Sequence, residues 1–577
     1  TNCGPRYSII RRVPYDRQNT SIARFAMCDH CAAEYHTPSD RRFHAQPTAC
    51  NDCGPTVSLV SPGGEVLADD AIKAAGALLT GGGIVAVKGL GGFHLAARAD
   101  DPAAVERLRV GKRRNAKPFA VMTRSLDAAR TLVSLSDDAA RLMASPVCPI
   151  VLAPRSGVCR LAENVAPGMH RLAVMLPYTP IHHLLFDAMP IDVLVMTSGN
   201  VSDEPLAIDN DEAIARLGGM CDALLLHDRP IVRAVDDSVV IDLPDGPMPV
   251  RRARGYVPVR LPLPDAAAQR VPNGLCLGGE LKNTAAVVRE GAVIVSQHLG
   301  NLRHPASFEA FKAAVNDLQQ LFDIQPRWIA HDLHPDYVST GWARELSRRT
   351  GLPLVAVQHH HAHAASLLAE HGRSARTLVV ACDGVGYGSD GGAWGGELLL
   401  ADLASATRLA RLRPLRLPGG DAAAKDTRRC TLALLFNTLG DGFADHSVVS
   451  RLYPEKAQRD LLCQMIRRNV QCASSSAAGR YFDGVAALLG VCSDNAFEGR
   501  APMLLEAAAA SVPAQEAAAL AEDGFGVFKG RLGDTDLSPL PSMREFNADG
   551  GLHVWVLSEL YRQTKNQDYL VAAQKMA

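Results

Sequence analysis

The sequence predicts a multidomain α/β protein. A chain of 577 residues is too long for one hydrophobic core, and 47% hydrophobic with 21% charged residues is ordinary for globular domains. Two C-x-x-C pairs lie within the first sixty residues, and glycine-rich turns follow apolar, strand-like runs in two later regions. A proline-rich linker, 261–273, separates those two regions. We therefore expect three to four domains, most of them with sheets covered by helices.

The bulk charge argues against a nucleic-acid-binding protein. Sixty basic and 61 acidic side chains give a formal net charge of −1, whereas nucleic-acid binders usually carry a basic excess. No run of eighteen apolar residues predicts a transmembrane helix, and the first residues lack the layout of a secretory signal. We expect a cytoplasmic protein without a membrane partner. Because the sequence begins at Thr1 without a Met, we also expect it to be a fragment of a longer chain.

The N-terminal region, 1–60, carries a four-cysteine pattern. Cys28, Cys31, Cys50 and Cys53 form C-x2-C-x18-C-x2-C, a spacing typical of a tetrahedral zinc site. Four thiolates fill every coordination position, so the zinc ion would be structural rather than catalytic. Two disulfides are the alternative, which the expected compartment disfavours.

In the middle region, 61–262, side chains that can bind anions lie at the ends of predicted strands. The strand 84–87 leads into Lys88 and a glycine-rich turn, although no Walker loop follows. Further cations, Lys112, Arg113 and Lys117, precede the strand 119–122 and could also bind phosphate. The alternative is that this basic run is a loop exposed to solvent. The strand 193–196 ends in three side chains suited to binding phosphate or carboxylate, namely Thr197, Ser198 and Asn200.

A histidine-rich stretch dominates the C-terminal region. We expect a buried strand at 353–357, a helix at 358–370 and a second buried strand at 378–381 that ends at Asp383. On a helix, His359 and His363 lie one turn apart on the same face and can share one metal ion. Asp383 is a natural third ligand. The alternative is that these histidines begin a helix without binding metal, either exposed to solvent or hydrogen-bonded within the core.

Further motifs resemble one family. The Lys88 strand end, the K-R-x-x-x-K-P element and T-S-G-N are similar to the YrdC/Sua-type fold, which makes carbamoyl- or threonylcarbamoyl-adenylates from ATP. Together with the four cysteines and D-R-R-F-H-A-Q-P at 40–47, they resemble the HypF family of hydrogenase maturation carbamoyltransferases. The resemblance implies a zinc knuckle, a YrdC-like domain at 61–262 and an actin-like (TsaD-like) ATPase domain at 274–577. The family also has an acylphosphatase-like domain, which this sequence lacks.

The resemblance also implies a two-site reaction. Carbamoyl phosphate supplies carbamate, which attacks ATP to give carbamoyl-adenylate, while Lys88, Lys112, Arg113 and Lys117 offset phosphate charge. The carbamoyl group then passes to the C-terminal cysteine of a HypE-like acceptor protein. The implied cofactors are structural Zn²⁺, ATP with Mg²⁺, and a divalent metal, Fe or Zn, on His359 and His363 with Asp383 beside them. The implied nucleotide-binding residues are Thr197, Ser198, Asn200, Lys282, Asn283, Asp483 and Gly499.

The C-terminal part departs from the family pattern. Members carry an L-S-G-G-x-x-x-N loop followed by an aspartate ligand, and 505–577 contains no such loop; Asp568 lacks the accompanying glycine turn. Lys425-Asp426-Thr427 also replaces an expected Arg-Glu-Pro. Two alternatives therefore stay open. One is another carbamoyl-type transferase, acting on tRNA or a natural product, and the other is a non-catalytic zinc-binding scaffold derived from the family.

Overall fold

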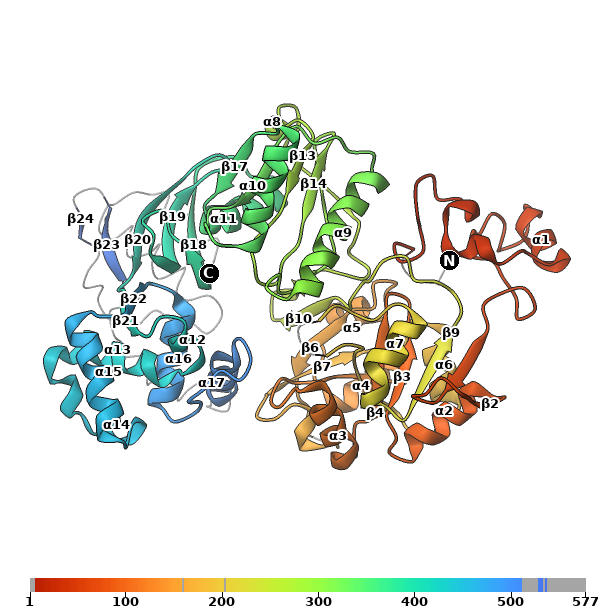
Figure 1. Ribbon diagram of the computed structural model, residues 1–577, viewed down its shortest axis with the longest axis horizontal. Coiled ribbons are helices and arrows are strands. Elements are labelled where there is room, and N and C mark those ends of the chain that lie inside the picture. Colours follow the sequence, from red (N-terminus) through yellow and green to blue (C-terminus); the bar gives the residue numbers. More distant parts are fainter. Residues whose placement is uncertain (1–5, 158–159, 202–203, 511–527, 533–534, 537–577) are drawn as a thin grey trace. The chain divides into compact units, whose positions relative to one another are not determined.

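The computed structural model describes residues 6–157, 160–201, 204–510, 528–532 and 535–536 (Figure 1). It confirms the multidomain α/β class. The chain divides into two compact units, the first comprising 1–331 with 335–355 and the second comprising 332–334 with 356–577. Among the described residues, no helix is long and apolar enough to cross a membrane.

The first described segment is held together by one arginine and one glutamine. The guanidinium of Arg17 donates to the carbonyls of Gln46, Thr48 and Phe25 at 2.9, 2.7 and 2.6 Å. The side-chain oxygen of Gln46 accepts from the backbone of Arg17 at 2.7 Å and from the hydroxyl of Tyr35 at 2.9 Å. The H-A-Q-P element therefore fastens the cysteine-containing region to the segment before it. The short helices here are η1 Arg17–Asn19, η2 Ser21–Arg24 and α1 Asp29–His36.

An eleven-stranded mixed sheet forms the core of the middle region, in the order β11-β10-β6-β7-β5-β8-β4-β3-β9-β1-β2. Its strands are β1 Val57–Val60, β2 Val66–Ala68, β3 Val85–Lys88, β4 Phe93–Arg98, β5 Ala120–Thr123, β6 Ile150–Pro154, β7 Arg171–Met175, β8 Val193–Ser198, β9 Ala223–His227, β10 Val239–Leu243 and β11 Gly246–Arg251. Its helices are α2 Ala71–Thr80, α3 Pro102–Lys112, α4 Leu126–Leu132, α5 Asp137–Met143, α6 Pro180–Asp187 and α7 Asn210–Leu217, with η3 Glu163–Val165 and η4 Gly218–Met220. Apolar side chains from both layers pack in one core.

The register of this sheet brings two predicted strand ends together. Strands β3 and β4 are antiparallel, with Lys88 opposite Phe93, so residues 89–92 form the connecting turn. Strand β8 is antiparallel to β4, with Ser198 opposite His94. The lysine turn and the T-S-G-N element therefore lie at the same edge, as expected for strands that share a ligand.

A six-stranded sheet follows, in the order β12-β15-β14-β13-β16-β17. Its elements are β12 Arg260–Pro262, α8 Asp265–Ala268, β13 Gly274–Cys276, β14 Ala286–Arg289, β15 Ala292–Val295, α9 Pro305–Leu321, β16 Ile329–Asp332, α10 Val338–Thr350 and β17 Leu354–Val357. Its core includes Leu275, Phe311 and Trp342. Gly274 has no room for a side chain, because an added Cβ would lie 2.1 Å from the ring of Trp328.

Two expectations about the histidine-rich stretch are wrong. Strand β17 was expected to be buried, but Leu354 and Val355 are 37% and 46% exposed because the strand lies at the edge of its sheet. The next strand does not end at Asp383. Strand β18, Thr377–Tyr387, continues past it, paired with β19, Ala393–Ala401, across a bulge between Cys382 and Gly386. The glycines there serve the bulge rather than a terminal turn. The helix prediction is confirmed by α11, His359–Glu370.

Strands β18 and β19 belong to a seven-stranded sheet, in which β18 pairs with β19 and the remaining order is β21-β22-β19-β20-β23-β24 (Figure 1). The other described strands are β20 Ala406–Leu412, β21 Leu415–Pro418, β22 Cys472–Ser475, β23 Phe528–Leu532 and β24 Thr535–Asp536. The helices are α12 Ala422–Lys425, α13 Arg428–Leu439, η5 Gly440–Asp445, α14 Ser447–Leu452, α15 Lys456–Arg468, α16 Ala478–Leu488 and α17 Arg500–Ala510. Asp568 and most of the departing tail lie outside the described residues.

Candidate functional site

The four predicted cysteines converge in space. Sulfur–sulfur distances are 3.7 Å between Cys28 and Cys50, 3.7 Å between Cys50 and Cys53, and 3.6 Å between Cys53 and Cys31. Ligands at the usual Zn–S length of about 2.3 Å would occupy tetrahedron corners about 3.8 Å apart. The cluster therefore fits a zinc ion, whereas disulfides would require sulfur atoms about 2 Å apart.

The local backbone prepares this cluster for metal. Backbone hydrogen bonds from Cys50 and Cys28 lower the pKa of the Cys53 thiol to about 6, which favours a thiolate there, whereas burial raises the pKa of the neighbouring Cys31 to about 12. Gly54 allows the second knuckle to close, because an added Cβ would lie 2.5 Å from the carbonyl oxygen of Cys50. All four positions are cysteine, so the site is closed and structural.

Lys88 lies buried at the end of β3. Its ammonium donates to the side-chain oxygen of Asn210 at 2.6 Å and to the carbonyl of His227 at 3.0 Å. Burial lowers its pKa to about 8, although Asp209 opposes the shift. A buried lysine that donates to neutral oxygens can turn to an anion at small cost.

Lys112 holds the T-S-G-N element in place. It ends helix α3, is only 1% exposed, and donates to the carbonyls of Ser198 and Asn200 at 2.5 and 2.6 Å and to the side-chain oxygen of Asn200 at 3.1 Å. The hydroxyl of Ser198 donates to the same oxygen of Asn200 at 2.7 Å, and the amide of Asn200 donates to the carbonyl of Glu204 at 2.6 Å. Three of the predicted site residues therefore form one hydrogen-bonded group.

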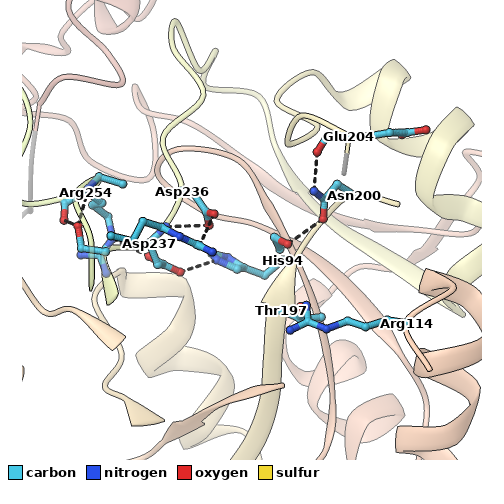
Figure 2. Close-up of polar contacts among 12 residues, drawn as sticks. His94, Arg114, Thr197, Asn200, Glu204, Asp236, Asp237 and Arg254 are labelled. Atoms are coloured by element: carbon cyan, nitrogen blue, oxygen red, sulfur yellow. Dashed lines mark hydrogen bonds and ion pairs between the residues drawn. The ribbon is translucent and has the colours of Figure 1, made fainter. Parts of the chain in front are cut away.

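The other predicted cations lie in the loop after α3. Arg113 and Lys117 are exposed, and Arg113 adopts left-handed backbone (φ 52°) at the helix end. Arg114, which the prediction did not include, reaches inward and donates to the hydroxyl of Thr197 at 3.4 Å (Figure 2). It also donates to the carbonyls of Lys117 and Pro118. The structure thus brings Lys112 and Arg114 to the T-S-G-N element and leaves Arg113 at the surface.

A buried ionic network lies beside this group (Figure 2). His94 contacts Asp237 at 3.0 Å, and Asp237 accepts from Arg254 at 2.8 Å. The guanidinium carbon of Arg254 lies over the ring of Tyr178, 3.5 Å from the ring centroid. Burial would raise the pKa of Asp237, but Arg254 and His94 hold it well below its usual range. A buried, paired carboxylate of this kind rigidifies the strand that presents Ser198.

The predicted histidine ligands also converge. Nε2 of His359 lies 3.3 Å from Nε2 of His363 and 3.3 Å from the carboxylate of Asp383. The three ligand atoms lie within 4.8 Å of one another, as one metal ion requires. Two imidazoles and one carboxylate suit iron or zinc and leave positions open for a substrate.

Asp332, which was not among the predicted site residues, completes the surroundings of this site. Nδ1 of His359 donates to its carboxylate at 2.7 Å, which leaves Nε2 for a metal. Burial alone would lower the pKa of His359, but Asp332 and Asp383 raise it to about 9. Burial would raise the pKa of Asp383, but His359 lowers it to about 2. A protonated His359 therefore pairs with both carboxylates, and a metal on Nε2 would displace the proton from that nitrogen.

The predicted nucleotide-side residues lie in different settings. Asn283 is buried and donates to the carbonyls of Leu277 and Gly279 at 2.9 and 2.6 Å, so it shapes the loop that carries the exposed Lys282. Gly499 has left-handed backbone (φ 79°) with open space around it.

Asp483 is fully buried. Its carboxylate accepts from Asn495 at 2.9 Å and pairs with Arg480 at 2.8 Å. Burial raises its pKa, and Arg480 opposes the shift.

Family models match most of the chain. Residues 27–60 match the HypF finger, and 77–253 match the Sua5, YciO and YrdC family described as telomere recombination. Residues 269–370 match the HypF Kae1-like domain, and 379–532 match the second subdomain of the carbamoyltransferase Kae1-like domain. The finger match and the cysteine geometry together confirm the structural zinc site.

Relatives match over nearly the same span. "Carbamoyltransferase HypF" of Rhodobacter capsulatus is 48% identical over 88% of this chain and 68% of its own length, and "Carbamoyltransferase HypF2" of Cupriavidus necator is 46% identical over 89% and 64%. A crystal structure of full-length HypF in the phosphate- and nucleotide-bound form matches with a TM-score of 0.82 and 42% identity, over 88% of this chain and 65% of that one. The T. kodakarensis HypF structure matches with a TM-score of 0.84 and 35% identity, over 89% and 67%. The chain thus spans about two thirds of these relatives, and it belongs to the HypF carbamoyltransferase family.

Proposed function

We propose that this chain forms carbamoyl-adenylate in its middle domain and passes the carbamoyl group to a thiol at the His359 site. The observation that carries the proposal is the presence of two separate polar clusters in a chain 48% identical to a relative named carbamoyltransferase HypF. One site is the buried cationic group around Lys112 and the T-S-G-N element. The other is the cluster of His359, His363 and Asp383.

The first step is an attack of carbamate on ATP. A carbamate oxygen forms a bond to the α-phosphorus, the bond to the bridging oxygen breaks, and pyrophosphate leaves with that electron pair. Lys88, Lys112, Arg113 and Lys117 would offset the charge that builds on the phosphates, with ATP entering as its Mg²⁺ complex. Thr197, Ser198 and Asn200 would orient the nucleotide and the carbamate, because they offer hydroxyl and amide groups at one strand end.

The second step is a transfer to sulfur. A thiolate attacks the carbonyl carbon of the adenylate, and AMP leaves with the electron pair of the broken bond. The acceptor is the C-terminal cysteine of a HypE-like protein in hydrogenase maturation, and a thiolate at neutral pH needs no protein base. A divalent metal, Fe or Zn, on His359, His363 and Asp383 would bind and neutralise the adenylate phosphate.

Loops of the C-terminal region would also contact nucleotide. Lys282 and Asn283 belong to a turn between two strands, the arrangement used by phosphate loops. Asp483 and Gly499 would contact the nucleoside part of the nucleotide.

ATP–pyrophosphate exchange tests the first step directly. Ammonium carbamate is supplied as substrate, so that no carbamoyl phosphate cleavage is needed. We expect exchange that depends on carbamate, and we expect Lys88→Ala to reduce it by about 10²- to 10³-fold, the scale found for removing one electrostatic donor. Zinc content, measured on the same samples, should stay unchanged because the finger lies apart from Lys88 in the sequence.

The matched control is Lys73→Ala, since Lys73 is an exposed lysine that pairs only with the helix cap Asp70 among the described contacts. This variant should exchange as fast as the parent. A parent chain that binds zinc but shows no carbamate-dependent exchange would contradict the adenylation step and favour the non-catalytic scaffold.

A further inference from the structure

Gln358 lies at the start of helix α11 and uses both ends of its side-chain amide there. The amide oxygen accepts from the backbone N–H of His361 at 2.9 Å, which caps the helix. The amide nitrogen lies 3.0 Å from the carbonyl oxygen of Tyr387 on β18 and 3.2 Å from Nδ1 of His360. A backbone N–H can only donate and a carbonyl oxygen can only accept, so these contacts fix which end of the amide is which.

This amide also determines which nitrogen of the His360 ring carries the proton. One N–H of Gln358 donates to the carbonyl of Tyr387, and the other is directed at Nδ1 of His360, which must therefore accept. The proton of the neutral imidazole is then on Nε2. The ring is 0% exposed and lies beside Trp394, with the ring centroids 6.0 Å apart. Because a buried N–H is normally hydrogen-bonded, Nε2 of His360 needs an acceptor.

Asp383 offers that acceptor. Its Oδ1 accepts from the backbone N–H of Gly384 at 2.6 Å, and its Oδ2 lies 3.3 Å from Nε2 of His359 and 3.7 Å from Nε2 of His360. In the described part of the chain, neither Nε2 of His360 nor Oδ2 of Asp383 has a hydrogen bond of ordinary geometry. The distance between them exceeds that of a hydrogen bond by about 0.5 Å, which a small rotation of the carboxylate would close. Contacts of this kind tighten when a site binds its ligand.

The same proton placement argues against His360 as a metal ligand. A ring nitrogen binds metal through its lone pair, whereas Nε2 of His360 carries the proton. Moving that proton to Nδ1 would direct it at the N–H of Gln358, so that two donors would face each other. His359 has the opposite arrangement, because its Nδ1 donates to Asp332 and its Nε2 is left for a metal. The two adjacent histidines therefore have different roles.

We propose that His360 is a positioning residue of the metal site: its Nε2–H holds Oδ2 of Asp383 toward the ligand nitrogens of His359 and His363. Gln358 in turn keeps the proton on Nε2 of His360. Hydrogen-bonded partners of a ligating carboxylate orient it in this way. The inference rests on the metal-binding part of the proposed function and deepens it by assigning Gln358 and His360 to that site.

Co²⁺ is the probe, added to full chain whose finger is already loaded with Zn²⁺. Its visible absorption reports both its affinity and the set of ligands around it. We expect His360→Phe, which keeps a buried ring without an N–H, to weaken Co²⁺ binding by about tenfold, the lower end of the range for losing a partner of a metal ligand. The absorption bands at saturation should keep their shape, because the ligands are unchanged. His360→Gln, whose amide supplies an N–H in place of Nε2–H, should restore most of the affinity.

His361→Phe is the matched control, since it is the same substitution at the next position, where the ring contacts the carbonyl of Asp402. It should bind Co²⁺ like the parent, and thermal unfolding of each variant reports its folding. Unchanged affinity in His360→Phe would overturn the inference, and so would equal losses in His360→Phe and His360→Gln, which would assign the effect to packing. Altered bands in His360→Phe would overturn it in favour of a ligand role. A parent chain that binds no Co²⁺ beside its finger zinc would overturn the proposed metal site as well, whereas these variant outcomes overturn the inference alone.

Discussion

Asp332 decides which ring nitrogen of His359 faces the other predicted metal ligands. Its carboxylate accepts from Nδ1 of His359 at 2.7 Å, so the other ring nitrogen, Nε2, faces His363 and Asp383. The same carboxylate group also accepts from the backbone N–H of His334 at 2.8 Å, which fixes its orientation. Hydrogen-bonded partners of this kind orient a ligand and raise its basicity.

We therefore expect Asp332→Asn to weaken binding of a divalent metal at this site by about 10- to 100-fold. Competition with a chromophoric chelator, on protein whose finger zinc is quantified separately, measures the change. Asp402→Asn is the control, because Asp402 caps an exposed turn in the same unit through Ala404 and Ser405. Equal affinities in the parent and Asp332→Asn would mean that the 2.7 Å contact does not orient the ligand.

Lys112 makes the adenylating site sensitive to pH. Burial and the neighbouring Arg114 lower its pKa to about 7 in the free protein, and a nearby polyphosphate would raise it again. Between these two pKa values the complex holds a proton that the free protein lacks, so affinity for the anion falls as pH rises above 7. The full contribution is present below pH 7.

Calorimetry of pyrophosphate binding at pH 8, in buffers of different ionisation enthalpy, should therefore show proton uptake of up to about 0.9 per site from Lys112. Lys112→Arg stays charged throughout and should lack this uptake. Subtracting the two data sets removes the ionisation of pyrophosphate itself. If both proteins take up the same number of protons, Lys112 does not titrate with the ligand.

At the scale of elements, sequence spacing predicted the contacts between residues that are close together in the chain. The cysteine knuckles and the His359–His363 pair each depend on residues three or four apart, and the structure brings each set together. Partners far apart in the chain could not be predicted. Asp332 lies 27 residues from His359 and Asp237 lies 143 residues from His94, and only strand order and register bring them into contact.

The course of β18 was mispredicted for a related reason. Glycines after Asp383 indicate a turn when read locally, but pairing with β19 keeps the segment extended across a bulge. One of these glycines is needed for packing, since an added Cβ at Gly386 would lie 2.5 Å from the ring of His359 and 2.6 Å from that of His360. Helix α11 therefore packs against the bulge through its histidines.

Gly386→Ala should displace those rings and weaken both the fold and the metal site. Overpacking of this kind costs about 1–3 kcal/mol, which thermal unfolding would detect, and metal affinity should fall with it. Gly384→Ala is the matched control on the same strand, because an added Cβ there meets no atom within 4 Å. Normal stability and metal affinity in Gly386→Ala would show that α11 can shift away without loss.

At the scale of the whole molecule, the two proposed reactions belong to two compact units. The cationic group around Lys112 lies in the first unit, and His359, His363, Asp383 and Asp332 all lie in the second. Disabling one site should therefore spare the reaction of the other.

We expect His359→Ala to abolish carbamoyl transfer to the acceptor thiol while carbamate-dependent ATP–pyrophosphate exchange persists, because His359 supplies a metal ligand only to the second unit. Lys88→Ala should do the reverse when carbamoyl-adenylate is supplied: exchange is lost and transfer remains. Both rates are measured on the same preparations. Radiolabelled pyrophosphate reports exchange, and the label that reaches the acceptor comes from carbamate in His359→Ala and from labelled carbamoyl-adenylate in Lys88→Ala. His361→Ala serves as the control, since that ring contacts the carbonyl of Asp402 instead of the metal ligands. Equal loss of both reactions in His359→Ala would mean that the two units act as a single catalytic site, and the division of labour proposed for them would have to be abandoned.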